Sequence, residues 1–488
     1  MLMPIYKKQR TAHFWWIVSL VCSGICAGAT LYLGTVGVRQ FWLEFFGLAA
    51  TIVVCGMVLA RAFGKLSLPI AVLAYFFFYF VLIPIAQQLL EVFDYHSESL
   101  EGISLATQGV VAFSVGALLL RSFVSNKNIL NVPVLEHKFD FLRRRGPIWA
   151  MLALGTISTF VAWRLGLASG GEGFGILGVL SSASAFLHLS ITFSAALWMS
   201  TKARSTLIVL ILSLLFAVVH GFLRISKGMM LVPFIDAALV FIVARQKFPL
   251  WLAPVLGLGY FLVVAPLVGV MRGERISSDL ANESDFAVLA SRSVQKTELG
   301  TSNIEQLYVI LRHLDRAGPR MLGAIVETTG RTTPFENGGT YVWALQTAVP
   351  RFIWPEKPDM SVGNVVGHKY LVIAEDDEVT AISPGLIGEM YMNFGYVGAI
   401  FGMFVLGIVT VLIQEFLLRF VGTAGLAYFF TGYFFSQESA VAHCVIPSLK
   451  SSLLIYVGLT AIRFISDHCN HGFRLEAPTS SHPESVGI

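Results

Sequence analysis

Charged residues are scarce in this chain. They make up 13% of its 488 residues, whereas hydrophobic residues make up 55%. A soluble domain carries roughly 25% charged residues, so the composition excludes a soluble globular protein and indicates a polytopic membrane protein. Because the hydrocarbon core of a bilayer offers no water to backbone groups, the long apolar runs predict helices and not strands.

Cysteine is scarce as well, and its placement predicts no structural disulfide. The five cysteines are Cys22, Cys26, Cys55, Cys444 and Cys469. Three fall inside predicted spans and only Cys444 is expected to face outward, so it has no obvious partner. His468, Cys469 and His471 lack a fourth ligand nearby, so this part of the tail does not predict a metal site.

About twelve apolar runs are long enough to be membrane spans, which predicts an all-α polytopic membrane protein. The first run is too long for the core of a signal peptide, and we expect it to be retained. It nearly touches the second, which predicts a tight hairpin at Arg39–Gln40. The spans are Phe14–Val38, Phe41–Ala60, Leu68–Leu90, Gly102–Phe123, Pro147–Gly166, Ile176–Met199, Thr206–Phe222, Met229–Ala244, Leu250–Val270, Val397–Leu418, Thr423–Ser439 and Ser452–Ile465.

The distribution of Lys and Arg predicts the orientation of these spans. Eighteen of these residues lie on the side of the N-terminus, against five in the short loops on the other side. Both termini are therefore expected in the cytoplasm. Residues 1–270 would hold nine spans, residues 271–396 a large outer insert, residues 397–465 three spans, and residues 466–488 a disordered cytoplasmic tail.

The insert of residues 271–396 is as large as a small domain, which a channel or carrier does not need. Within it, Met321–Thr328 and Tyr341–Ala348 are predicted short helices, with a turn at Gly338-Gly339 between them. Eleven Lys and Arg against sixteen Asp and Glu give the insert a net charge of −5. Particular side chains, and not bulk potential, would therefore hold an anion. The acidic run Glu375–Glu378 is most simply a solvated loop, and a divalent cation site is the alternative.

Several cations lie where the charge rule disfavours them. Arg224 and Lys227 occupy a very short outer connection, and Arg164, Arg272 and Arg275 lie at the outer ends of predicted spans. Together they would form a basic ring suited to a phosphate or pyrophosphate head group, because guanidinium groups bind phosphate through forked hydrogen bonds. Snorkelling of these side chains to lipid phosphates is the alternative.

A carboxylate stands among apolar residues where the insert meets the tenth span. Glu389 lies in the run Gly385–Gly398, and a charge at the bilayer boundary is expensive. We expect it to have either a cationic partner that fixes the loop or a role in proton transfer. His443, in the last outer loop, is a second candidate, although a lone histidine is more often structural.

Three stretches between Gly339 and Gly398 carry the most specific pattern, namely G-T-Y, V-P-R-F-I-W-P-E-K-P and I-G-E-M-Y-M-N-F-G-Y-V-G. With the topology, they resemble the bacterial O-antigen or oligosaccharide repeat-unit polymerases (Wzy-type). The resemblance implies a GT-C-like glycosyltransferase fold in the bacterial inner membrane, with the insert in the periplasm. It implies lipid-linked oligosaccharides as donor and acceptor, polyprenyl pyrophosphate as leaving group, and no metal or other cofactor. A chain-length-regulating membrane protein would be the partner, and no nucleic acid is expected.

This chemistry suggests roles for particular residues. A pyrophosphate leaving group needs fixed positive charge nearby, and the acceptor hydroxyl needs a base. The candidates for the positive charge are Arg224, Lys227, Arg272 and Arg351. The candidates for the base are Glu389 and then His443. The aromatic residues that would stack on sugar faces are Tyr341, Trp343, Trp354 and Tyr391, and packing within the insert is an equal alternative.

Other classes of protein fit part of this pattern. An O-antigen ligase-like transferase would use a similar donor with a lipid A–core acceptor, and a catalytic histidine in the insert, His313 or His368, would favour it. A flippase or carrier of lipid-linked glycans should have charges inside its spans. The charged residues found there are Glu44, Asp236, Glu415 and Glu438. A scaffold for a secretion complex is a further reading, with the insert as its docking surface.

Overall fold

The computed structural model describes residues 36–64, 67–89, 97–123, 145–164, 183–223, 227–243, 318–349, 354, 356, 362–371, 373, 382–420, 422–437, 452–466 and 468. Within these residues the regular elements are helices, and there is no strand. Five of the described helices are long and apolar enough to cross a membrane. The expected all-helical class is thus confirmed for this part of the chain, and its helices are compatible with a multi-pass membrane protein.

The first described helices agree with the predicted spans, with one correction. Helix α2 (Val36–Phe63) begins five residues before the predicted span, and Arg39–Gln40 is helical. The predicted hairpin at these two residues is therefore wrong. The next predicted span corresponds to three helical segments that follow one another without a break, namely α3 (Leu68–Phe77), the π-helical turn η1 (Phe78–Leu82) and α4 (Ile83–Leu89). Helix α5 (Ser97–Phe123) follows them.

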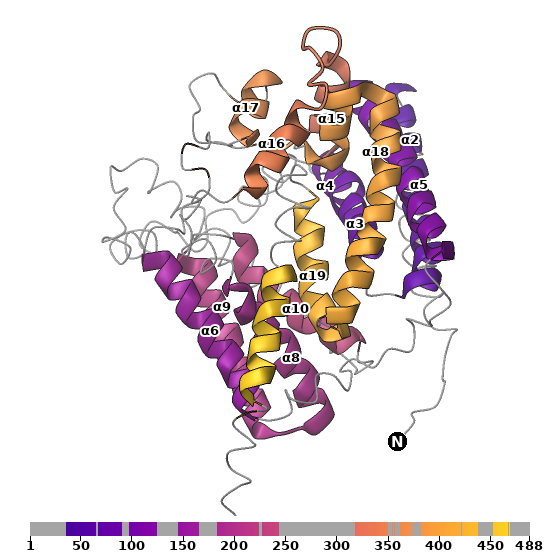
Figure 1. Cartoon of the computed structure of the whole chain (residues 1–488). Coiled ribbons are helices and arrows are strands. Elements are labelled where there is room, and N and C mark those ends of the chain that lie inside the picture. The colour runs from indigo at the N-terminus through magenta and orange to yellow at the C-terminus, as the bar shows by residue number, and fades with distance from the viewer. Residues whose placement is uncertain are drawn as a thin grey trace, which may run out of the picture.

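A second group of helices packs beside the first (Figure 1). Its members are α6 (Arg145–Arg164), α8 (Ala185–Thr201), α9 (Arg204–Leu223), α10 (Lys227–Val243), α19 (Gly422–Ser436) and an apolar helix at Ser452–Ser466. Each falls on a predicted span. The predicted first span, apart from its last three residues, and the ninth, Leu250–Val270, lie outside the described residues.

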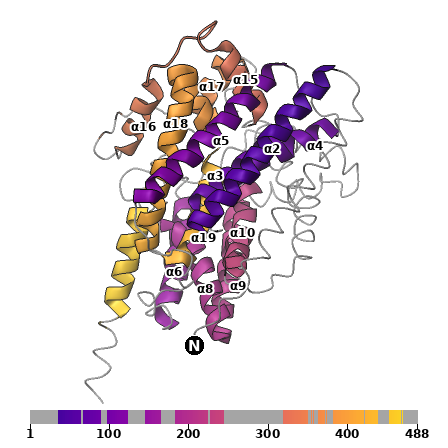
Figure 2. The ribbon, with the colours of Figure 1, turned by 90° about the vertical axis from the view of Figure 1, so that its right-hand side faces the viewer.

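Three short helices form a cap over one end of the bundle (Figures 1 and 2). They are α15 (Pro319–Thr328), α16 (Gly339–Ala348) and α17 (Val362–Lys369). The first two were predicted, whereas α17 was not. The cap has its own buried core, formed by Met321, Ile325, Val366, Tyr370, Ile382 and Met392. Since Met392 belongs to the following helix, this core also attaches the cap to the bundle.

Helix α18 (Gly385–Phe420) is a helical hairpin. Its backbone leaves the helical region at Phe394 and at Gly395, where φ is +66°. A Cβ atom added at Gly402 would lie 2.6 Å from Sδ of Met390. In a straight helix, residues twelve positions apart lie about 18 Å apart. Residues 385–393, the short arm, therefore fold back against residues 396–420, the long arm.

This hairpin changes the interpretation of the segment before the tenth span. The sequence predicted that residues up to Tyr396 belong to the insert and lead into a span at Val397. The long arm begins at that position, but the preceding residues are helical and lie beside it instead of forming a loop above it. Glycine provides the turn, because a left-handed φ is strained for residues with a Cβ atom.

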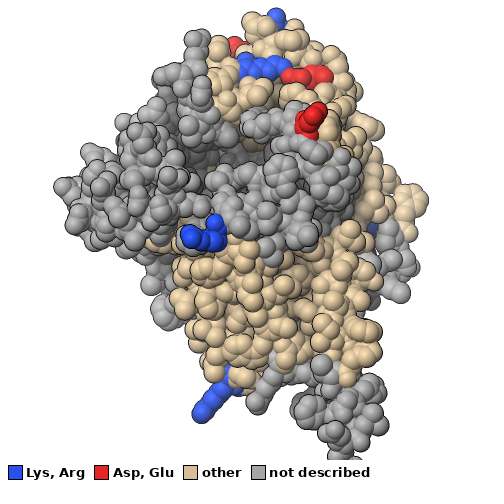
Figure 3. Space-filling model, turned by 60° about the vertical axis from the view of Figure 1, so that its left-hand side comes forward, with Lys and Arg blue, Asp and Glu red and all other residues tan. Residues whose placement is uncertain are grey.

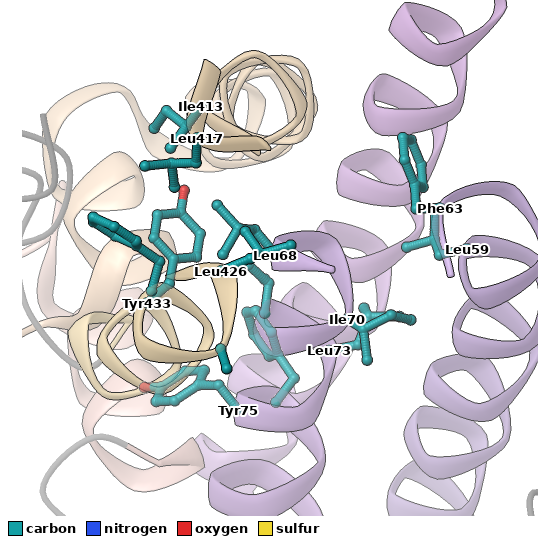
Figure 4. Close-up of a cluster of buried hydrophobic side chains, with 14 of the residues drawn as sticks. Leu59, Phe63, Leu68, Ile70, Leu73, Tyr75, Ile413, Leu417, Leu426 and Tyr433 are labelled. Atoms are coloured by element: carbon teal, nitrogen blue, oxygen red, sulfur yellow. The ribbon is translucent and has the colours of Figure 1, made fainter. Parts of the chain in front are cut away.

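The long arm packs tightly on α5 through glycines. A Cβ atom at Gly116 would lie 2.0 Å from the carbonyl oxygen of Phe404, and one at Gly407 would lie 2.1 Å from that of Phe113. Such close approach of backbones is typical of membrane helix pairs, where small residues allow van der Waals packing. On the other side of the long arm, Leu417 packs with α3 and α19 in the cluster shown in Figure 4.

Charge is unevenly distributed on the face of the molecule shown in Figure 3. Lys, Arg, Asp and Glu side chains lie over the cap, a further Lys or Arg group lies at mid-height, and the described surface below it is uncharged down to a Lys or Arg side chain at the lower edge. Large apolar side chains on the long arm are exposed, among them Val397 at 77% and Phe401 at 65%. An uncharged, apolar band of this kind suits contact with lipid.

Candidate active site

Glu389 lies in the middle of the short arm, and only 1% of it is exposed. Its neighbours in the chain, Ile387 and Met390, are also buried. Because Met390 lies against Gly402, the carboxyl group is level with the first turns of the long arm. The expectation of an apolar setting for Glu389 is therefore met. Its place is inside the end of the bundle beneath the cap, and not in a loop.

Tyr341 approaches Glu389 from the cap. Its ring stacks on Phe394 with centroids 6.0 Å apart and an interplanar angle of 29°. Burial, and then the nearby Glu389 carboxylate, raise the pKa of the Tyr341 hydroxyl. The hydroxyl therefore stays protonated near neutral pH and is a neutral hydrogen-bond donor next to an acidic group.

Asn393 fixes the relative position of these two residues. Its Oδ1 accepts a hydrogen bond from the backbone N–H of Gly338 at 2.8 Å. Its Nδ2 donates to Oγ1 of Thr340 at 2.7 Å and to the carbonyl oxygen of Glu389 at 2.8 Å. One buried amide thus joins the first turn of α16, which carries Tyr341, to the turn of the short arm that carries Glu389.

The remaining predicted aromatic residues lie in or near the cap. Trp343 packs against the cap core, and Tyr391 packs against both this core and the bundle core. The Tyr391 hydroxyl donates to the carbonyl oxygen of Val326 at 3.4 Å. Trp354 is half-buried. For Trp343 and Tyr391 the structure therefore shows the packing that was the alternative to sugar stacking.

The predicted basic ring falls largely outside the described residues. Arg164 is the last residue of α6 and is exposed, and Lys227 begins α10. Side-chain positions are not described for Arg224, Lys227, Arg272, Arg275, Arg351 and His443. The pyrophosphate site and the second candidate base thus stay predictions. Within the described residues, no group of three or more His, Cys, Asp and Glu side chains is placed to hold a metal ion.

Two polar features of the described bundle were missed from the sequence. One is Asn393 with its partner Thr340, although an amide in the apolar run M-Y-M-N-F-G was a visible signal. The other is a hydrogen-bonded pair in the bundle, His188 of α8 and Asp236 of α10, whose Nδ1 and Oδ2 atoms are 3.0 Å apart. Asp236 was noted as a charge inside a span, but its spacing from His188 gave no sign of a contact.

The described part of the chain is helical and compatible with a multi-pass membrane protein, and it holds a buried carboxyl group beneath a small helical cap. Residues 176–437 match the family model described as "Domain of unknown function (DUF8712)", and the chain belongs to this family. The matched region contains Glu389, Tyr341, Asn393 and the His188–Asp236 pair. No curated protein and no solved structure matches the chain.

Proposed function

We propose that this protein polymerises lipid-linked oligosaccharide repeat units at the outer face of the bacterial cytoplasmic membrane. It would transfer the growing glycan from polyprenyl pyrophosphate to an incoming lipid-linked unit. The apolar helices support a membrane location, and the motifs of residues 339–398 support the reaction class. The GT-C-like fold, the periplasmic position of the cap and the cytoplasmic termini are parts of the same proposal.

The observation that carries this proposal is the buried Glu389 carboxyl group, whose helical turn Asn393 joins to the first turn of the cap helix that carries Tyr341. Carboxylates are among the side chains that act as general bases when they lie within hydrogen-bond reach of the hydroxyl that reacts. In the proposed reaction Glu389 takes the proton of the acceptor hydroxyl as its oxygen attacks the anomeric carbon of the donor sugar. The bond to the pyrophosphate oxygen breaks, and polyprenyl pyrophosphate leaves with the bonding electron pair.

Other residues would assist this transfer. Tyr341, which stays protonated, would donate a hydrogen bond to a sugar oxygen and orient the acceptor. Arg351, Arg224, Lys227 and Arg272 would stabilise the negative charge that develops on the leaving group. Asn393 would act as a positioning residue, because its hydrogen bonds hold the cap helix α16 on the short arm.

Deletion of the gene tests the reaction class, with the surface glycan separated on a gel. Loss of a polymerase leaves single repeat units on the core or lipid acceptor, and this is the expected result. Long polymer retained on the polyprenyl carrier would identify a ligase-like transferase instead. Normal polymer in the deletion strain would contradict both assignments.

A carrier of lipid-linked glycans is the second candidate, and the buried His188–Asp236 pair is the observation that favours it. Ionisable groups inside membrane spans often mark transport pathways. The same deletion separates this candidate, because loss of a carrier leaves unpolymerised units facing the cytoplasm. Labelling of those units in intact and opened cells reveals on which side they accumulate.

A further inference from the structure

The His188–Asp236 pair is the most deeply buried ionisable group in the described bundle outside the Glu389 site. Asp236 is 0% exposed, and 14% of the His188 side chain is exposed. The Oδ2 atom of Asp236 lies 3.0 Å from Nδ1 of His188. The imidazole thus joins a fully buried carboxyl group to a more accessible position.

Burial restricts the charge that this pair can carry. An uncompensated charge in an apolar interior is strongly unfavourable. The groups that act on Asp236 within the described residues are the His188 imidazole and the Thr431 hydroxyl. Thr431 is neutral, so His188 must balance the carboxylate. A neutral imidazole and a carboxylate together have a net charge of −1. One additional proton, shared between the two groups, makes the pair neutral, and release of that proton returns the net charge to −1.

The pair lies where three helices meet. His188 comes from α8, Asp236 from α10, and Thr431 and Tyr428 from α19. The ring of Tyr428, a further titratable group, lies 5.7 Å from that of His188 between centroids. On the α9 side of α8, the hydroxyls of Ser190 and Ser213 are 2.7 Å apart. Helix α9 also carries one buried titratable side chain, His220, near its end. A change in the charge of the pair would therefore act on the packing of α8, α10 and α19.

Two further features connect the pair to other parts of the bundle, so that a change in its charge can alter their packing. Pro233 lies inside α10, three residues before Asp236, and proline removes a helical N–H donor and makes bending at that turn easier. Helix α19 leads to Gln437, whose carbonyl oxygen accepts a hydrogen bond from the backbone N–H of Leu386 at 3.3 Å. Through this contact, α19 touches the short arm that carries Glu389.

We propose that His188 and Asp236 form a proton-binding site within the membrane. The arrangement described above is the loaded form, in which the shared proton keeps the pair neutral and the three helices packed. Release of this proton to solvent on the His188 side leaves a buried carboxylate, which must gain water. The packing of α10 against α8 and α19 then loosens. This inference does not depend on the glycan reaction.

Hydrogen exchange of the full-length protein in detergent micelles tests the proposal across a range of pH. The measured exchange rates are first corrected for the intrinsic pH dependence of exchange. The equilibrium constant for opening of α10 should then increase by about tenfold for each unit that the pH rises, in the range where opening requires release of the proton. The variant Asp236→Asn cannot lose this proton, so its α10 should stay equally protected at every pH. Ser213→Ala is the matched control. It removes a buried hydrogen bond of α8 but leaves the pair intact, so it should keep the wild-type pH dependence.

The outcomes are distinct. Corrected protection of α10 that does not vary with pH in the wild type contradicts the proposal, as does a wild-type slope that persists in Asp236→Asn. If Asp236→Asn fails to fold, His188→Gln provides the second test. It removes the proton-sharing partner, so it must change the pH at which protection of α10 is lost. An identical curve in His188→Gln and wild type would show that the pair binds no exchangeable proton.

Discussion

Asn393 and Thr340, 53 positions apart in the chain, are joined by a hydrogen bond of 2.7 Å from Nδ2 to Oγ1. The bond is buried, and it connects the short arm of α18 to the first turn of the cap helix α16. With the bond from Gly338 N–H to Oδ1, it fixes Tyr341 beside Glu389. The candidate site is therefore assembled from two segments that the sequence separates.

Replacement of Asn393 by leucine should loosen this assembly. The variant leaves the N–H of Gly338 and the hydroxyl of Thr340 without their hydrogen-bond partner. Each buried polar group left unpaired in this way lowers the stability of the fold by about 1–3 kcal/mol. We expect a lower midpoint of thermal unfolding in detergent and faster proteolysis of the cap. Asn337→Gly is the control, because the Asn337 amide is exposed and its backbone φ is already positive. Equal stability of the two variants would show that the amide is not the link.

The hairpin of α18 leads to a second prediction. A Cβ atom at Gly398 would lie 2.2 Å from Cβ of Phe394, so Gly398→Ala should force the two arms apart. Overpacking of this kind costs about 1–3 kcal/mol. Gly432→Ala is the matched helical control, since a Cβ atom there meets nothing within 4 Å. Thermal unfolding should show a lower midpoint for the first variant and an unchanged or higher one for the second. The reverse order would rule out the folded-back arm.

The sequence predicted individual helices well and the site only in part. Apolar runs and the turn at Gly338-Gly339 located most described spans and two of the three cap helices, because hydrophobic length and helix-breaking residues are local signals. The fold-back at Gly395 was not predicted, since an apolar segment before a span also fits a helix that continues straight. Glu389 was singled out by its charge. Asn393 and the His188–Asp236 pair depend on contacts between distant segments, which periodicity in one sequence does not contain.

Tyr341 should contribute a hydrogen bond and not a titrating group. Burial and the Glu389 charge raise its pKa above the ordinary tyrosine value of about 10, so it stays protonated throughout the range of an activity assay. Tyr341→Phe should therefore lower the transfer rate by about tenfold, the equivalent of one hydrogen bond, without changing the shape of the pH profile.

Tyr370→Phe is the control for this experiment, because that hydroxyl bonds Thr329 at 2.9 Å within the cap. We expect its transfer rate to equal that of the wild type. A change in the pH profile of Tyr341→Phe, with loss of its alkaline limb, would show that Tyr341 itself titrates and would contradict the assigned role.

The central claim is that the buried Glu389 side chain, as a carboxylate, accepts the proton of the acceptor hydroxyl. The most direct measurement is polymer formation by the purified protein in lipid vesicles, with lipid-linked repeat units extracted from the deletion strain. Glu389→Gln keeps the shape of the side chain and removes the base, so it should lower the rate by roughly 10²- to 10⁴-fold while the unfolding midpoint stays near that of the wild type. Wild-type rates and chain lengths from a folded Glu389→Gln protein would contradict the claim.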